Sequence, residues 1–128
     1  MKILTATSDR ELSAALCAVL RYEGHLPIIV YDGAEAINEL SGGGFDAIVA
    51  DEGLPRVRFD QLINKDAALP LPVLILVRQG VSPDIARERP GRTELLRFPF
   101  ELKDFTDALG RLFLEDRTDP AGSDGAAQ

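Results

Sequence analysis

Asp51 is the residue of this chain best placed to do chemistry. It ends an apolar run at residues 45–50 that is interrupted by Asp46, and Gly53 and Pro55 turn the chain directly after it. Such a run is typical of a strand buried on both faces of a parallel sheet. Ligand and reaction sites of these sheets lie just beyond the carboxyl ends of the strands. Asp51 is therefore a candidate reactive carboxylate, with turn capping as the simpler alternative.

Other reactive side chains are few. The chain has a single cysteine, Cys17, and a single histidine, His25, so a disulfide scaffold and a metal site built from these residues are excluded by count. Cys17 lies in a helical pattern and is expected in the core. The formal net charge of −7 argues against a protein that binds a phosphate backbone, which would carry a basic patch. A DNA-binding domain elsewhere on a longer parent chain stays compatible with this charge.

Five short apolar segments predict strands, at residues 2–6, 26–30, 45–51, 73–77 and 94–98. Helical patterns alternate with them, so the sequence predicts an α/β fold: a doubly wound, five-stranded parallel sheet with helices on both faces. Pro27 cannot donate a hydrogen bond to a neighbouring strand, which places the second strand at an edge of the sheet. This placement favours the strand order 2-1-3-4-5 of flavodoxin-like folds.

The first of five expected helices begins with Ser8 and Glu11, which spell a capping box and make Ser8 the predicted N-cap. Gly24 is a natural residue to end this helix. The second, third and last helices are expected at residues 34–40, 59–66 and 101–114. Prolines leave only residues 84–89 for the fourth, and a helix under two turns is marginal without packing. A shortened or mobile fourth helix is therefore predicted.

Residues 1–114 are predicted to form one domain, because the chain is long enough to close a single hydrophobic core. Residues 115–128 are polar and are expected to be a disordered tail or the start of a linker. No apolar run approaches the length of a membrane span, and the N-terminus lacks the apolar segment of a signal peptide. A soluble cytoplasmic protein is expected.

Several segments taken together resemble the receiver domain of two-component response regulators, which has the CheY-like fold. The resemblance covers residues 2–114 and is carried by residues 2–4, 32–36, 45–55 and 99–100. In that family an aspartate at the end of the third strand accepts a phosphoryl group, and the resemblance places this role on Asp51. Phosphoryl transfer depends on positioning and charge neutralisation. The family supplies these with two acids that hold Mg²⁺, a Ser or Thr on the fourth strand, and a lysine before a cis-proline.

This chain departs from the family pattern at four positions. The two acidic positions fall on Thr7 and Ser8, the hydroxyl position on Val77 and the lysine position on Phe98. Mg²⁺ prefers hard anionic oxygens, so Thr7 and Ser8 argue against a Mg²⁺ site and no cofactor is expected. Shifting the alignment by one residue would bring Asp9 into the acidic pair, but the predicted N-cap at Ser8 argues against that shift.

Two neighbours of the site carry further expectations from the resemblance. Arg78 replaces a residue that is usually small and could reach over the strand ends to pair with Asp51. The alternative is that its guanidinium points to solvent while its stem covers apolar surface. Pro99 falls at the family's cis-peptide site, and the Phe98-Pro99 bond is predicted to be cis, since X-Pro bonds adopt this form at low cost. Phe98 either fills the core or anchors a partner.

Two functions follow from these departures. The first is an atypical receiver, or pseudo-receiver: a non-enzymatic interaction module without Mg²⁺-dependent phosphorylation. It would contact a signalling protein or an output domain through residues 84–114, with a homodimer as a further option and no direct contact with nucleic acid or membrane. The second is a phospho-accepting receiver that uses Asp51 with non-standard auxiliary residues. A flavodoxin-like cofactor protein is disfavoured, because the turn at residues 5–8 has no glycine to grip a phosphate.

Overall fold

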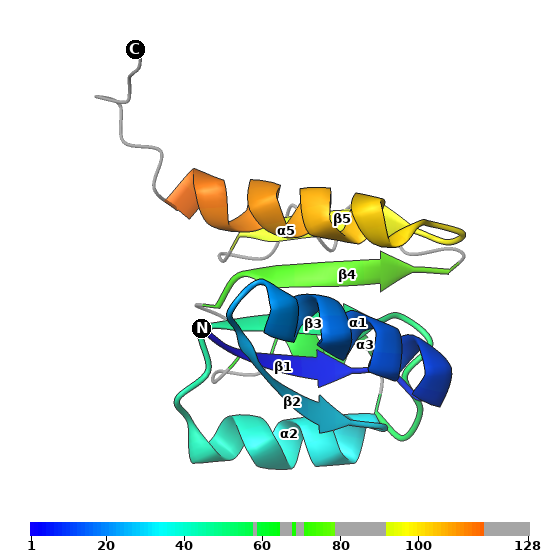
Figure 1. The fold of residues 1–128 in the computed structure, drawn as a ribbon. Coiled ribbons are helices and arrows are strands. Elements are labelled where there is room, and N and C mark those ends of the chain that lie inside the picture. The colour runs from blue at the N-terminus through cyan, green and yellow to red at the C-terminus, as the bar shows by residue number, and fades with distance from the viewer. Residues whose placement is uncertain (58, 65–67, 69–70, 79–91, 117–128) are drawn as a thin grey trace.

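The structure is a computed structural model, and it describes residues 1–57, 59–64, 68, 71–78 and 92–116. Its strands are β1 (Lys2–Ala6), β2 (Leu26–Val30), β3 (Ala47–Asp51), β4 (Val73–Val77) and β5 (Thr93–Arg97). They form one parallel sheet in the order β2-β1-β3-β4-β5, and the arrows of β1, β2 and β4 can be seen to point the same way in Figure 1. The predicted fold class and strand order are therefore confirmed, with β2 and its Pro27 at an edge.

The helices of the described residues are α1 (Arg10–Tyr22), α2 (Gly33–Gly42), α3 (Phe59–Ile63) and α5 (Leu102–Asp116). They cover the two faces of the sheet. On one face α1 and α5 bury apolar residues such as Leu16 and Phe105, and on the other α2 and α3 bury residues such as Leu40 and Leu62. β3 and β4 are buried along their whole length between these layers.

The N-cap of α1 is Asp9, so the predicted capping box at Ser8 is wrong. The Asp9 side chain accepts a hydrogen bond from the Leu12 N–H at 3.0 Å. Thr7, Ser8 and Asp9 are all capable caps, and the tertiary fold chooses among them because the Thr7 hydroxyl, already held in the core, accepts the Asp9 N–H at 3.2 Å. Gly24 follows the helix with φ +90°, as expected of the residue that ends it.

Other element boundaries differ slightly from the prediction. β5 begins and ends one residue earlier than predicted. The Phe98 N–H still donates to the Val77 carbonyl, but the next residue, Pro99, has no N–H with which to continue the ladder. α5 continues to Asp116, two residues beyond the predicted end of the helix. The fourth helix predicted at 84–89 and the tail beyond residue 116 lie outside the described residues.

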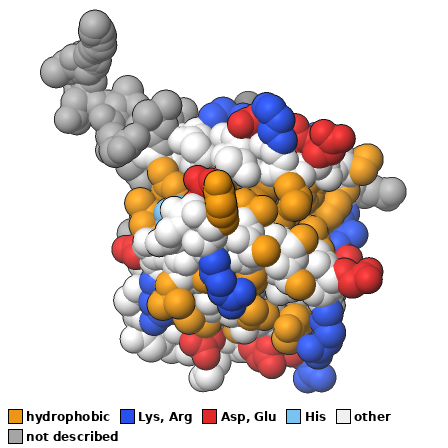
Figure 2. Space-filling view, in the orientation of Figure 1, with side chains coloured by type: hydrophobic (Ala, Val, Ile, Leu, Met, Phe, Trp, Pro, Cys, Tyr) orange, Lys and Arg blue, Asp and Glu red, His pale blue; other side chains and the backbone are white. Residues whose placement is uncertain are grey.

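The carboxyl ends of four strands meet along one edge of the sheet. Thr7 follows β1, Asp51 ends β3, Arg78 follows β4 and Phe98 follows β5. Charges of both signs and apolar side chains are interspersed on the face of the molecule seen in Figure 2. None of the helices in the described part of the chain combines the length and apolar character needed to cross a membrane.

Candidate functional site at the carboxyl ends of the strands

Asp51 lies at the bottom of the site, with a side chain that is 1% exposed. The strand that carries it is buried at every position, so its carboxylate leaves the sheet edge directly from the core. The chain turns immediately after it, and the Gly53 N–H donates to Asp51 Oδ1 at 2.8 Å. The turn that the sequence predicted at Gly53 thus supplies a backbone donor to the carboxylate.

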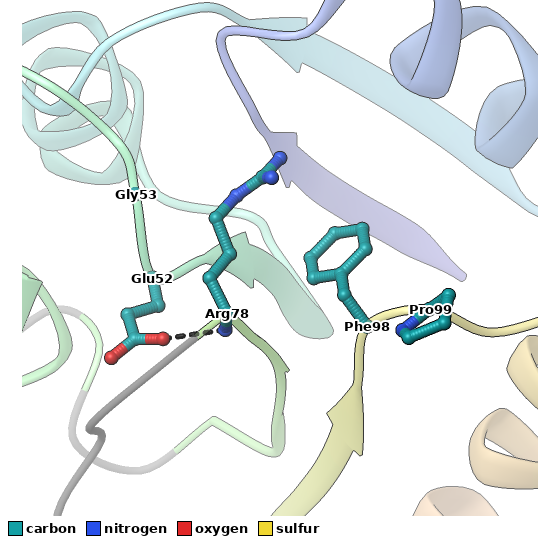
Figure 3. Close-up of a pocket in the computed structure, with 5 residues that line it drawn as sticks. All are labelled: Glu52, Gly53, Arg78, Phe98 and Pro99. Atoms are coloured by element: carbon teal, nitrogen blue, oxygen red, sulfur yellow. Dashed lines mark hydrogen bonds between the residues drawn. The ribbon is translucent and has the colours of Figure 1, made fainter.

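Arg78 reaches across from the end of β4 to Asp51. Its Nε donates to Oδ1 and its Nη2 to Oδ2, both at 2.8 Å, in a two-bond ion pair. The Arg78 backbone N–H donates to the Glu52 carboxylate, drawn as the dashed line in Figure 3. Arg78 is therefore held by two consecutive acidic residues of the neighbouring strand end, and its guanidinium does not point to solvent.

Thr7 completes the shell around Asp51 from the end of β1. Its buried hydroxyl donates to Asp51 Oδ2 at 2.8 Å and so occupies the position where the family pattern has an acid. Ser8, at the second acidic position, is exposed. Each oxygen of the Asp51 carboxylate now accepts two hydrogen bonds, one from Arg78 and one from Thr7 or Gly53. Sequence reasoning treated Thr7 only as a missing acid and overlooked this donor.

Phe98 lies over the other side of the Arg78 side chain. The Arg78 Cζ is 4.2 Å from the centroid of the Phe98 ring, which is a cation–π contact. Phe98 is half-buried, packs against the α1–α5 core and contacts the Phe100 ring at 4.9 Å between centroids. The Phe98-Pro99 peptide bond is cis. The residue at the lysine position therefore contributes an aromatic surface that supports the arginine.

Val77 faces away from this chemistry. Its side chain is completely buried in the core cluster beneath α2 and α3. It offers no hydroxyl to the site, and its register position on β4 places Arg78 one residue further on, at the mouth. A pocket of about 780 Å³ opens there, lined by Glu52, Gly53, Arg78, Phe98 and Pro99 (Figure 3).

The electrostatics of Asp51 follow from these contacts. Burial by itself would raise the pKa of the Asp51 carboxyl, but the hydrogen bonds from Arg78, Gly53 and Thr7 and the charge of Arg78 outweigh it and hold the pKa below its usual value. The pKa of Arg78 is raised in turn, chiefly by its hydrogen bond to Asp51. The two side chains thus form a charged pair at neutral pH.

The donor set around Asp51 determines what else the site can hold. Within the described residues, no three His, Cys, Asp or Glu side chains gather where they could bind a metal ion. The groups bonded to Asp51 are a hydroxyl, a guanidinium and a backbone N–H, all of which donate hydrogen bonds to it rather than offering further anionic oxygens. These residues do not fit the all-oxygen, carboxylate-rich ligand set that Mg²⁺ prefers.

Comparison with known proteins gives relatives among response regulators. The chain is 39% identical over 105 residues to the response regulator protein PmrA of Pseudomonas aeruginosa, covering 80% of this chain and 48% of that protein. It is 32% identical over 117 residues to the transcriptional regulatory protein CutR of Streptomyces coelicolor, covering 87% and 54%. The chain therefore spans about half the length of the curated relatives it matches. A scan of protein-family models found no match.

Solved structures share the fold. The chemotaxis response regulator CheY4 of Vibrio cholerae superposes with a TM-score of 0.74 at 21% identity, covering 87% of this chain and 97% of that one. The receiver domain of a sensor histidine kinase from Pseudomonas aeruginosa, whose structure has a magnesium ion in its active-site cleft, gives a TM-score of 0.70 at 22% identity, covering 87% and 95%. These likenesses show that the chain has the fold of receiver domains, with Asp51 at the end of β3, and that the proteins aligned with most of it include a response regulator.

Proposed function

We propose that this chain is an atypical receiver, a pseudo-receiver, that acts in two-component-type signalling through protein–protein contacts without Mg²⁺-dependent phosphorylation. The observation that carries the proposal is the saturated Asp51 carboxylate. Both of its oxygens already accept two hydrogen bonds, and its charge is already neutralised by Arg78. A carboxylate in this state is a poor nucleophile, because attack on a phosphoryl group requires a free oxygen lone pair.

The auxiliary positions support the same proposal. Charge stabilisation of a transferring phosphoryl group needs cations that face the incoming oxygens. Among the described residues the cation bonded to Asp51 is Arg78, whose Nε and Nη2 both donate to the aspartate itself. The positions of the Mg²⁺ ligands hold hydroxyl residues, Thr7 and Ser8, and the lysine position holds Phe98. The site therefore keeps the acceptor and lacks the groups that would make it react.

The partner under this proposal is a signalling protein or an output domain, on the same chain or another, contacted in the cytoplasm through the region of residues 84–114. The described part of that region is β5 and α5, where Arg111 and Glu94 form an ion pair at 3.0 Å and Lys103 and Asp107 another at 2.9 Å. The alignments cover only about half the length of the two relatives named above, one of which is a transcriptional regulatory protein, and this supports an output domain as the partner. The contact needs no catalysis by the chain.

The retained Asp51 favours one alternative, a phospho-accepting receiver with non-standard auxiliary residues. Amide NMR spectra during titration with Mg²⁺ and beryllofluoride, a phosphoryl mimic, distinguish the two. We expect no saturable shifts around Asp51 in the wild-type protein, and the same flat response in Asp51→Asn. Saturable shifts in the wild type that are absent from Asp51→Asn would establish the alternative. Intact mass measurement after incubation with acetyl phosphate provides a second readout, with an acyl phosphate on Asp51 as the contrary result.

A further inference from the structure

The outer edge of β2 is where the sheet could add another strand. The Leu26 N–H donates to the Met1 carbonyl at 2.8 Å, and the Val30 carbonyl accepts the Thr7 N–H at 3.2 Å. Backbone groups of a paired strand face its neighbour at alternate residues. Residues 26, 28 and 30 therefore bond to β1, and residues 25, 27, 29 and 31 turn their backbone groups outward.

Most of the outward-facing positions have no free backbone N–H, because the group is either hydrogen-bonded within the molecule or missing. The His25 N–H bonds to the Leu20 carbonyl at 2.9 Å, at the end of α1. Position 27 is proline and has no N–H. The Tyr31 N–H bonds to Glu35 Oε1 at 2.8 Å, in the first turn of α2. Among outward residues 25–31, all of which the structure describes, Ile29 alone has an N–H without a partner.

The side chains at this edge would otherwise invite pairing. Leu26 is 57% exposed and Ile29 is 37% exposed, and exposed apolar edge strands are templates for pairing with other chains. β2 is the outermost strand of the sheet in Figure 1, with no strand beyond it. The exposed apolar side chains thus favour self-association through this edge, and the lack of free N–H donors opposes it.

We propose that Pro27 and Glu35 prevent the β2 edge from pairing with the β2 edge of a second copy of this chain. In an antiparallel pairing centred on residue 28, residue 27 of one copy faces residue 29 of the other, and each such pair normally exchanges two N–H···O bonds. The proline removes one donor from both pairs. Glu35 removes the next donor along the strand by holding the Tyr31 N–H.

The test compares self-association of the full chain and its variants by sedimentation velocity over a wide range of concentrations. The double variant Pro27→Val/Glu35→Ala restores both donors, and we expect its average mass to rise with concentration above that of the wild type. Pro27→Val/Glu35→Gln is the matched control, because a glutamine oxygen still accepts the Tyr31 N–H, and it should associate more weakly.

Adding Ile29→Pro to the double variant separates backbone bonding from hydrophobic contact. It blocks the other outward residue of each facing pair, and we expect the mass to return toward the wild-type value. Far-UV circular dichroism checks that each variant is folded. The proposal is overturned if the folded double variant keeps the wild-type mass at every concentration, or if the triple variant associates as strongly as the double.

Discussion

The Arg78 guanidinium donates two parallel hydrogen bonds to the Asp51 carboxylate, from Nε to Oδ1 and from Nη2 to Oδ2, each 2.8 Å long. Two parallel bonds fix the relative orientation of the guanidinium and the carboxylate as a single bond would not. Because a guanidinium stays protonated at all physiological pH values, the positive charge beside Asp51 is permanent. In our proposal this pair takes the place of a reversible chemical modification, and the predictions below test its strength and its supports.

Removing the arginine should weaken the fold. In Arg78→Ala the buried Asp51 keeps Thr7 and Gly53 as donors but loses its cation. Breaking a fully buried pair costs about 3–5 kcal/mol, and because the Arg78 side chain is 43% exposed and screened by solvent we expect a loss of about 1–3 kcal/mol. Chemical denaturation measures it, and a double-mutant cycle with Asp51→Asn should give a favourable coupling energy. Additive single effects would contradict a pair that acts as a unit.

The free energy of unfolding should decrease in acid as Asp51 becomes protonated. Its pKa is lowered in the folded state despite burial, so its contribution is complete above the pKa of a free aspartate, about 3.9. That contribution is lost as the pH falls through the folded value. The difference in free energy of unfolding between wild type and Asp51→Asn should therefore shrink in acid. In an Arg78→Ala background burial is no longer offset by the guanidinium, and a difference that still shrank in the same way would contradict this account.

The Thr7 hydroxyl should matter more than its methyl group. It donates to Asp51 Oδ2 and accepts the Asp9 N–H, so Thr7→Val leaves buried polar groups unpaired at a cost of about 1–3 kcal/mol. Thr7→Ser keeps the hydroxyl and loses one methyl, for which we expect about 1 kcal/mol. Denaturation curves of the two variants give the comparison. Equal losses would mean that packing, not hydrogen bonding, holds Thr7.

A side chain at Gly53 should displace Arg78 slightly from its position on Asp51. A Cβ built at Gly53 lies 3.1 Å from Arg78 Cδ and 3.2 Å from Nε, closer than ordinary contact. In Gly53→Ala the NMR signal of the Arg78 Nε–H should shift as its bond to Asp51 lengthens. Gly42→Ala is the matched control, since a Cβ there meets nothing within 4 Å. An unchanged Arg78 signal in Gly53→Ala would show that the arginine does not depend on this close approach.

Alanine substitutions at two other glycines should change the stability of the fold in opposite directions, because Gly33 packs tightly against the loop after β3 and Gly110 has open space around it. A Cβ at Gly33 would lie 2.6 Å from Val57 Cβ, so Gly33→Ala should destabilise the fold by about 1–3 kcal/mol through overpacking. Gly110 lies inside α5 with nothing within 4 Å of its Cβ position, and Gly110→Ala should stabilise by about 0.5–1 kcal/mol. Thermal melting of both variants checks the signs, and a shared sign would contradict this account of the space around Gly33.

The backbone chemistry of single residues made much of this architecture predictable. Proline has no N–H, so Pro27 placed β2 at the edge of the sheet, and Gly24 allowed the positive φ that follows α1. The apolar run before Asp51 predicted a buried strand, because side chains alternate between the two faces of a strand and an unbroken apolar run therefore means that neither face contacts water. Such properties belong to a residue and its immediate neighbours, and they need no knowledge of the rest of the chain.

The partners of Asp51 depended on the tertiary structure. Thr7 and Arg78 come from the ends of the two strands beside β3, and their distances to the carboxylate are set by sheet register rather than by sequence spacing, whereas Gly53 lies only two residues from Asp51 in the turn that the sequence predicted. Whether a flexible arginine turns toward solvent or toward a carboxylate depends on what surrounds it, and here Phe98 and Glu52 hold Arg78 in place. The N-cap of α1 was decided in the same way, because burial of Thr7 moved the start of the helix from Ser8 to Asp9.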